Sequence, residues 1–305
     1  MSSLDLVAIG HALVDIRFIV SGFPGPDQET EILEEARGSG GSAVNVAIDA
    51  AKLGGKSGII SKIGFDPFGK IIFEELWNEG IDVRGVRISP TGSTGFSIVT
   101  IDTRGEIILY SCKGVAESLE PQEIPSDVIR DSKSIHIASL RLDTSLRSAQ
   151  IARESGILTS WDPGRKMAKM GLDKASPLLE YIDVVFLNRL EAKLMTGKEP
   201  AEAAKLIASR GPKWVIVKLG GEGALLYDNG KLHRIPPYTP PRIIDTTGAG
   251  DAFAAATLIK IIKGYDVLEA VNYAAAVAAL KISRLGSHNL PSLNEIEEFI
   301  RNKSY

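Results

Sequence analysis

The strongest constraint on the fold is a regular alternation of short apolar runs with helix-forming segments along most of the 305-residue chain. The runs VVFL (184–187) and WVIV (214–217) contain no charged residue, which is typical of strands that are covered on both faces. The segment SAVNVAIDAAKLGG (42–55) lies between such runs and reads as a helix with a serine cap and a terminal glycine pair. The alternation predicts an α/β protein in three layers, with a mostly parallel sheet between two layers of helices.

Two stretches interrupt this alternation, because they contain strand patterns and no helix pattern. They are ALVDIRFIVSGFPGPDQETEILEEARG (12–38) and STGFSIVTIDTRGEIILYSCKG (93–114). We predict that they form a small β-sheet outside the main layers, and the alternative is a pair of hairpins at the edges of the main sheet. The predicted domains are a main α/β domain over 1–11, 39–87 and 115–305 and a β lid over 12–38 and 88–114.

Composition and charge exclude several classes of partner. The formal net charge is −3 and no run of Lys or Arg is present, so neither nucleic acid nor an anionic membrane is expected to bind. No apolar run is long enough to span a membrane, and the N-terminus lacks a signal-peptide pattern. The single cysteine, Cys112, cannot form a disulfide within the chain, which fits a reducing compartment. We therefore expect a cytoplasmic protein.

The segment IIDTTGAGDAFAAATLI (243–259) places small residues directly before a long helix pattern. We expect Ile243 and Ile244 to end a strand and the helix to follow the glycine-rich turn. The first N–H groups of a helix have no partner within it, and the helix dipole favours negative charge there. The turn at Gly248, Ala249 and Gly250 is therefore predicted to bind an anion.

Asp251 follows this turn, where a carboxylate would repel the bound anion. One interpretation is that Asp251 accepts a proton from a hydroxyl group that attacks a phosphoryl group held by the turn. The alternative is a carboxylate that only caps the helix. The four histidines, at positions 11, 136, 233 and 288, do not have the spacing of a zinc site.

Three motifs in order along the chain resemble those of the ribokinase-like (PfkB) carbohydrate kinases. DTTGAGDAFAAA (245–256) resembles the C-terminal signature of the family, GSGGSAVNVAIDAAKLG (38–54) resembles the N-terminal signature, and NRLE (188–191) matches an N-x-x-E motif. The resemblance covers nearly the whole chain and implies a ribokinase-like fold with a lid. The chain contains no P-loop motif, and GHALVD follows the first predicted strand in place of a dinucleotide-binding G-x-G-x-x-G.

The resemblance assigns roles around the phosphoryl-transfer site. It implies that Asp251 is the catalytic base and that the amides of Gly248, Ala249, Gly250 and Asp251 form an anion hole. The residues implied to bind the acceptor hydroxyls are Asp15, Gly40, Gly41 and Asn45. The alternatives are a polar lid residue for Asp15 and a structural helix residue for Asn45.

The resemblance also implies sites for ATP and Mg²⁺. Glu191 would hold Mg²⁺ through water near Asn188, and the alternative is a helix cap with a surface glutamate. In KLGGEGALLYD (218–228), the residues implied to contact the nucleotide are Lys218, Gly220 and Gly223. Lys218 replaces a threonine that is common in relatives, and it either reaches a phosphate or is solvated.

Three further expectations rest on the resemblance. Asp245, Thr247 and Gly286 match positions that hold a monovalent cation such as K⁺ in some relatives. The small residues after Ala274 would flank the adenine, although Ala274 replaces a common Asn or His, and Arg165 either faces the phosphates or is a surface residue. The lid sheets of relatives often pair, which suggests a homodimer through the lid.

We therefore expect an ATP-dependent phosphotransferase that acts on a hydroxymethyl group of a small sugar. The alternative is a nucleoside kinase of the same family, because nucleoside kinases of the archaeal type share the DPG stretch at 162–164 and the GH…D opening at 10–15. A phosphosugar acceptor is disfavoured, since no basic cluster is visible in the N-terminal half. A non-catalytic sugar- or nucleotide-binding regulator is a weaker alternative, because the aspartate and glycines of the turn are intact.

Overall fold

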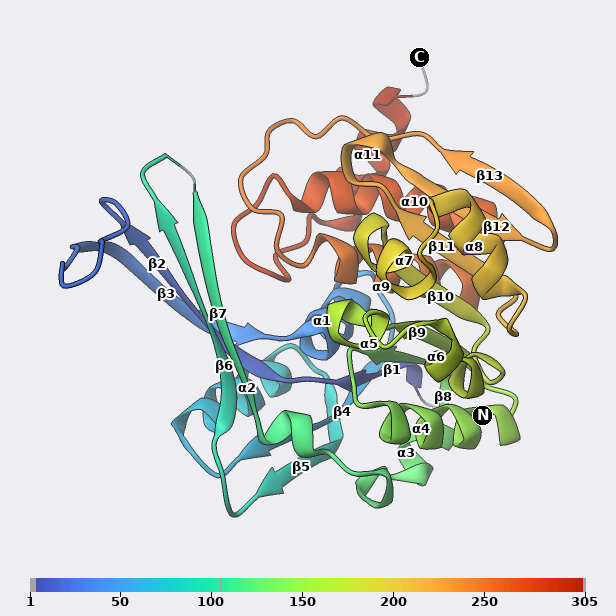
Figure 1. Ribbon diagram of the computed structural model, residues 1–305, viewed down its shortest axis with the longest axis horizontal. Coiled ribbons are helices and arrows are strands. Elements are labelled where there is room, and N and C mark those ends of the chain that lie inside the picture. The colour runs from blue at the N-terminus through green and yellow to red at the C-terminus, as the bar shows by residue number, and fades with distance from the viewer. Residues whose placement is uncertain (1–3, 105, 304–305) are drawn as a thin grey trace.

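A large twisted sheet forms the centre of the protein (Figure 1). The computed structural model describes residues 4–104 and 106–303. The sheet has the strand order β13-β12-β11-β10-β9-β8-β1-β4-β5. All neighbours are parallel except β11–β12 and β12–β13. From β5 to β13 in that order, the strands span Asp82–Ser89, Ser57–Gly64, Leu4–Gly10, Ser132–Ala138, Leu158–Asp162, Val184–Asn188, Trp214–Lys218, Ala224–Asp228 and Lys231–Ile235.

Helices cover both faces of this sheet. Val184 and Phe186 pack into the core on one face, whereas Val185 and Leu187 pack into the core on the other. The first face carries α1 (Ser42–Lys52), α2 (Pro67–Asn78), α9 (Ala249–Ile262), α10 (Val267–Lys281) and α11 (Leu293–Lys303). The second carries α3 (Ser126–Arg130), α4 (Leu142–Glu154), α5 (Gly164–Ala168), α6 (Leu172–Leu179), α7 (Arg189–Thr196) and α8 (Pro200–Ala208). The predicted three-layer architecture is confirmed.

A separate four-stranded sheet projects from the main body (Figure 1). Its order is β3-β2-β6-β7, with antiparallel outer pairs and a parallel central pair β2–β6. These strands span Leu13–Val20 (β2), Ile32–Gly40 (β3), Thr94–Asp102 (β6) and Ile107–Gly114 (β7). The small sheet predicted from the sequence is confirmed, and the edge-hairpin alternative is wrong. The exact domain boundaries stay a prediction, and β5 continues in the large sheet to Ser89.

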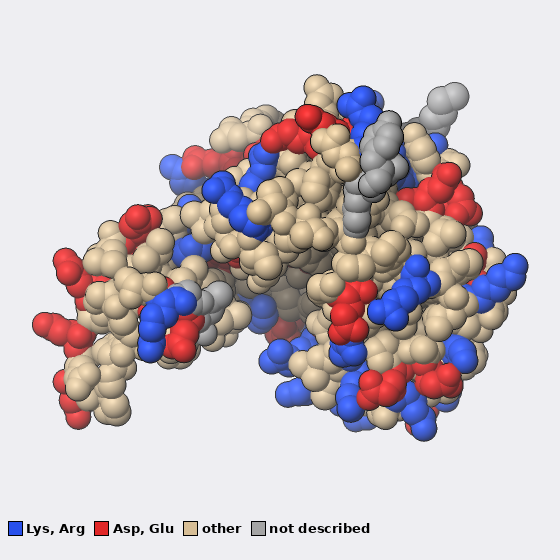
Figure 2. Space-filling model, turned by 90° about the horizontal axis from the view of Figure 1, so that it is seen from above, with Lys and Arg blue, Asp and Glu red and all other residues tan. Residues whose placement is uncertain are grey.

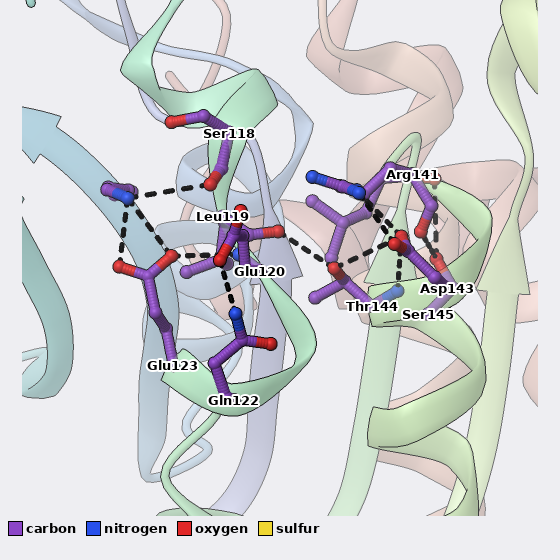
Figure 3. Close-up of polar contacts among 11 residues, drawn as sticks. Ser118, Leu119, Glu120, Gln122, Glu123, Arg141, Asp143, Thr144 and Ser145 are labelled. Atoms are coloured by element: carbon purple, nitrogen blue, oxygen red, sulfur yellow. Dashed lines mark hydrogen bonds and ion pairs between the residues drawn. The ribbon is translucent and has the colours of Figure 1, made fainter.

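Two short 3₁₀ helices lead from the small sheet to α3 and contact α4. They are η1 (Val115–Ser118) and η2 (Pro121–Glu123), and a third, η3 (Gly220–Glu222), follows β11. The Oγ1 atom of Thr144 donates to the carbonyl of Leu119 at 2.8 Å, and the N–H of Glu120 donates to Glu123 Oε2 at 2.8 Å (Figure 3). These bonds fix the chain where it leaves the small sheet.

Two local predictions are wrong. Helix α1 has Gly41 rather than Ser42 as its N-cap, with φ +91°, because the carbonyl oxygen of His11 would lie 2.5 Å from a Cβ atom there and leaves room only for glycine. Ile243 and Ile244 lie in a loop and are 69% and 44% exposed, because the N–H of Ile244 donates to the carbonyl of Ile282 after α10 rather than to a strand. Over the described ranges, none of the helices combines the length and apolarity needed to cross a bilayer.

Candidate active site

The glycine-rich turn forms the N-terminus of α9, as its sequence predicts. Gly248 is the N-cap with φ +76°, and a Cβ atom there would lie 1.9 Å from the carbonyl oxygen of Ser287. Only glycine fits this position without strain. The N–H of Ala249 donates to the carbonyl of Thr246 at 3.3 Å, so the remaining amides of the turn are better placed for a ligand. Their role as an anion hole stays a prediction.

Asp251 meets Asn45 where α9 packs against α1. Asn45 Nδ2 donates to Asp251 Oδ2 at 2.7 Å, and Asn45 is buried. Burial raises the pKa of Asp251 to about 6, with a contribution from the charge of Asp162. Hydrogen bonds from Asn45 and Ser42 oppose this rise. A carboxyl group with a pKa near 6 is ionised at neutral pH and accepts a proton more readily than an ordinary aspartate.

Polar and charged side chains lie where three neighbouring strands end. Asp162, Asn188 and Lys218 are the last residues of β9, β10 and β11. Lys218 Nζ donates to Asp162 Oδ2 at 2.9 Å, and both side chains are 17% exposed. Burial alone would lower the pKa of Lys218, but the charge of Asp162 raises it. The lysine is therefore cationic in a protected position, and the solvated alternative is wrong.

Asn188 and Glu191 form a reciprocal cap at the start of α7. Asn188 Oδ1 accepts from the N–H of Glu191 at 2.9 Å, and Glu191 Oε2 accepts from the N–H of Asn188 at 2.8 Å. The two residues therefore form the helix cap that the alternative predicted. Glu191 is buried, however, so the same alternative is wrong in placing this glutamate on the surface. Burial, together with the charge of Asp162, raises the pKa of Glu191.

A cavity of about 490 Å³ brings the predicted nucleotide residues together. Its polar end is lined by Asn188, Lys218, Gly220 and Gly223, and Ala249 and Gly250 also line it. The rest of the wall is apolar, and its lining includes Tyr238, Phe253, Ala275, Ala278, Ala279 and Ile282. Its volume and its mixture of apolar wall and few polar groups are typical of a small-molecule site.

A second cavity, of about 310 Å³, lies on the other side of the same helix terminus. Its lining includes the predicted acceptor residues Asp15, Gly41 and Asn45, together with Gly248 and Asp251. The hydroxyl of Ser97 donates to Asp15 Oδ1. Gly40 does not line the cavity, but a Cβ atom there would lie 2.1 Å from Asp15 Oδ2. Gly40 thus makes room for the Asp15 carboxylate. Figure 2 shows the surface hollowed between the projecting sheet and the main body.

Asp245 organises the loop before the turn. Its Oδ1 atom accepts from the N–H of Thr247 at 2.9 Å, and its Oδ2 atom accepts from the N–H of Gly286 at 3.0 Å. Arg17 of the small sheet also donates to Oδ2, at 3.1 Å. The fold therefore joins the three residues predicted for a monovalent cation. Within the described part of the chain, no group of three or more His, Cys, Asp or Glu side chains could hold a metal ion.

Sequence reasoning missed two residues that shape this site. Asp162 pairs with Lys218 and raises the pKa of Asp251, and its position at the end of an apolar strand was the available signal. His288 contacts Asn45 Oδ1 through Nδ1 at 3.3 Å and Glu75 Oε1 through Nε2 at 2.9 Å. No local pattern marks His288, because its partners lie far away in the sequence.

Several predicted residues, among them Glu191, Arg165 and Ala274, line neither of these two cavities. Arg165 is exposed and lines neither of them, which favours its alternative as a surface residue. Ala274 is buried in the core, whereas Ala275, Ala278 and Ala279 face the larger cavity. The helix therefore supplies the predicted apolar wall with residues one to five positions after Ala274.

Comparison with known proteins gives a consistent result. Residues 3–293 match the family described as pfkB family carbohydrate kinase. The chain is 32% identical over 295 residues to an ATP-dependent ribose-1-phosphate kinase of Halopiger xanaduensis, with 97% of each protein covered.

Two solved structures resemble the whole chain. A putative ribokinase II from E. coli in complex with ATP and Mg²⁺ has a TM-score of 0.85 and 28% identity, and the match covers 98% of this chain and 99% of that one. A nucleoside kinase from Methanocaldococcus jannaschii has a TM-score of 0.86 and 26% identity, with 99% of each chain covered. The ribokinase-like fold is confirmed.

Proposed function

The chain belongs to the pfkB family of carbohydrate kinases, and on that premise we propose that it phosphorylates a hydroxymethyl group of a small sugar with ATP. The observation that carries the proposal is the meeting of two cavities at the N-terminus of α9. The larger one is lined by Ala249 and Gly250, and the smaller one by Gly248 and Asp251. A donor and an acceptor bound on the two sides would face each other across one helix terminus.

In the proposed reaction Asp251 is the general base. The acceptor hydroxyl in the smaller cavity gives its proton to Asp251 while its oxygen forms a bond to the γ-phosphorus and the bond to ADP breaks. The free amides at the start of α9 stabilise the charge on the phosphoryl oxygens. Asn45 orients the Asp251 carboxylate through the 2.7 Å hydrogen bond. The small sheet walls the acceptor cavity and would exclude water from the reaction.

The residues at the strand ends fit Mg²⁺ bound through water. Asp162 lies close enough to Glu191 for its charge to raise the pKa of that glutamate, and one or two carboxylates with water and phosphate oxygens are a common Mg²⁺ environment. When bound, Mg²⁺ would neutralise charge on the phosphates. Lys218 would contact a phosphate from the wall of the larger cavity. The ATP and Mg²⁺ in the similar E. coli structure support this donor.

The proposal is tested by incubating the purified protein and ATP with pentoses, hexoses, keto-acid sugars and nucleosides. ADP release and the mass of the product identify the acceptor. Asp251→Asn should lower turnover by about 10²–10⁴-fold, the usual contribution of a general base. Asp173→Asn is the matched control, because that side chain is 93% exposed. Absence of any phosphorylated product would refute the function, and full turnover by Asp251→Asn would refute the assigned base.

A nucleoside acceptor is the second candidate. Val99, Ile101 and Leu109 of the small sheet line the acceptor cavity, and these aliphatic side chains could pack against a nucleobase. The nucleoside kinase from Methanocaldococcus jannaschii is among the similar structures. A kcat/KM for a nucleoside well above that for free ribose would favour this candidate, and the reverse order would favour a free sugar.

The structure also provides evidence on whether a sugar phosphate could be the acceptor. A cavity of about 290 Å³ that shares Asp15 with the acceptor cavity is lined by Arg17, Arg37, Lys52 and His288. The sequence showed no basic cluster because these residues are far apart along the chain. Each already pairs with a carboxylate, so a phosphate would have to compete with acidic side chains. Ribose and ribose 1-phosphate, compared in the same assay, separate the two acceptors.

Dimerisation through the small sheet is proposed as well. Its outer strands β3 and β7 carry exposed Leu33, Leu109 and Tyr110, and paired sheets would cover such side chains. Light scattering should give a dimer mass, and Tyr110→Lys should shift it towards the monomer. A monomer at all concentrations would contradict this arrangement. We also propose a cytosolic location, which the single cysteine supports.

A further inference from the structure

Lys281 is a fully buried lysine that the proposed reaction does not use. It is the last residue of α10, and its relative exposure is 0%. Its Nζ atom donates to the carbonyl of Asp245 at 3.2 Å and to the carbonyl of Thr247. An ammonium group buried in this way requires compensating partners, and two of these partners lie directly before the turn that begins α9.

The same loop residues were expected, by resemblance, to hold a monovalent cation. That cation does not fit this chain, because the Lys281 ammonium already binds the carbonyl oxygens of Asp245 and Thr247. We propose that Lys281 takes the place of the monovalent cation and holds the anion-binding turn in its working shape. Lys281 is thus a positioning residue, and the kinase activity, which rests on the proposed function, should not depend on K⁺.

Peptide geometry links Lys281 to the anion-binding site. The carbonyl of Thr247 and the N–H of Gly248 belong to one planar trans peptide and point in opposite directions. A carbonyl aimed at Lys281 therefore directs the Gly248 N–H away from Lys281, and Gly248 lines the acceptor cavity. Loss of the ammonium would free this peptide to rotate.

Charged side chains from several elements surround Lys281 behind the helix terminus. Burial raises the pKa of Asp245, but hydrogen bonds from Thr247 and Gly286 and the charge of Lys281 together lower it, so Asp245 is ionised. Asp245 thus interacts with two cations, Lys281 and Arg17. Burial lowers the pKa of Lys281, and the charges of Asp245, Asp49 and Asp251 oppose this effect while that of Arg17 adds to it.

The first experiment uses the unmodified protein. Thermal unfolding and turnover are measured in KCl and in choline chloride at equal ionic strength, so that screening is constant. We expect the same melting temperature and the same turnover in both salts. In crystals soaked with RbCl we expect no anomalous peak at the carbonyls of Asp245 and Thr247. A rubidium peak there, or stabilisation by K⁺ alone, would overturn the proposal.

The second experiment removes the ammonium. Lys281→Ala should lose about tenfold to hundredfold in turnover, at or below the usual cost of losing one direct oxyanion donor. It should regain activity and melting temperature in KCl, because K⁺ can enter the space left by the side chain. Lys281→Met fills that space without a charge, so KCl should not rescue it. Lys263→Ala is the control, since Lys263 also donates to a carbonyl, that of Leu53, but away from the site.

These readouts separate the two proposals. If no acceptor is phosphorylated by the unmodified protein, the proposed function fails, yet rubidium binding and K⁺-dependent melting still decide the role of Lys281. If Lys281→Ala gains neither activity nor stability from K⁺ and shows no rubidium peak, the replacement of a cation by Lys281 is refuted. If that variant does not fold, a rubidium peak in the unmodified protein remains the refuting result and its absence the supporting one.

Discussion

The raised pKa of Asp251 should lower the free energy of unfolding of the protein, and this decrease can be measured. Burial raises its pKa to about 6, compared with an ordinary value of 3.8. The folded protein therefore binds this proton more tightly than the unfolded chain does. An acid of this kind reduces the free energy of unfolding as the pH rises from the unfolded pKa through the folded one. Asp251→Asn, which removes the charge and keeps the shape, should stabilise the protein at neutral pH and above.

The size of the effect follows from the pKa. A difference of about two pKa units is worth about 3 kcal/mol, at 1.36 kcal/mol per unit. At pH 8 the wild-type carboxylate is fully ionised, so Asp251→Asn should gain up to about 3 kcal/mol. At pH 5 most of the wild-type side chain is protonated, and the gain should be about half as large. The side chain introduced by Asp251→Asn still carries an oxygen that can accept from the Asn45 amide, so this hydrogen bond is kept and the change in stability reports the charge.

The assay is denaturant unfolding followed by tryptophan fluorescence at pH 8 and pH 5, with turnover measured on the same samples. Asp173→Asn, at an exposed site, should change neither stability nor turnover. The expected combination for Asp251→Asn is greater stability with strongly reduced turnover. A variant that is less stable than wild type at pH 8, or a gain in stability that is equal at both pH values, would show that burial does not raise the pKa of Asp251.

Three further predictions concern the same site. The value of kcat/KM should fall about tenfold per pH unit below pH 6, because only ionised Asp251 accepts a proton. Lys218→Met should shift this acidic limb of the pH–rate profile to higher pH, because the charge of Lys218 lowers the pKa of Asp251. An acidic limb at the same pH in the variant would contradict this effect. Gly248→Ala should lose about 2–4 kcal/mol in denaturant unfolding, because its Cβ would collide with the carbonyl of Ser287 at a φ of +76°; wild-type stability would mean that the turn relaxes freely. His288→Ala should lower kcat roughly tenfold with little change in the KM for ATP, because Asn45 loses the contact that holds its amide; steady-state kinetics with unchanged kcat would remove His288 from the positioning network.

The hydrogen-bond network around Asp251 explains why sequence reasoning found Asp251 but missed the residues that hold it. Glu75 contacts His288, His288 contacts Asn45, and Asn45 donates to Asp251. Glu75 and Asn45 lie on α2 and α1, whereas His288 follows α10. Hydrogen bonds between side chains over such separations follow no local period, so only the packing of these helices brings them together.

Local predictions failed where the backbone met a distant part of the chain. Ser42 has the residue type of a helix cap, yet the close approach of the His11 carbonyl to Gly41 makes that glycine the cap. Ile244 follows the pattern of a strand end, yet its N–H bonds to the carbonyl of Ile282. In both cases a contact with a distant part of the chain overrode the local preference.

The sequence by itself determined the three-layer fold, the separate small sheet and the position of the glycine-rich turn that begins α9, because these depend on periodicity and on short motifs. Only the tertiary structure decided that Lys218 pairs with Asp162, that basic residues gather beside Asp15, and that Lys281 contacts the carbonyls of Asp245 and Thr247. The physical reason is that the charge and burial of a side chain depend on neighbours from other elements. A lysine at the end of an alanine-rich helix looks like a solvated residue until the chain folds around it.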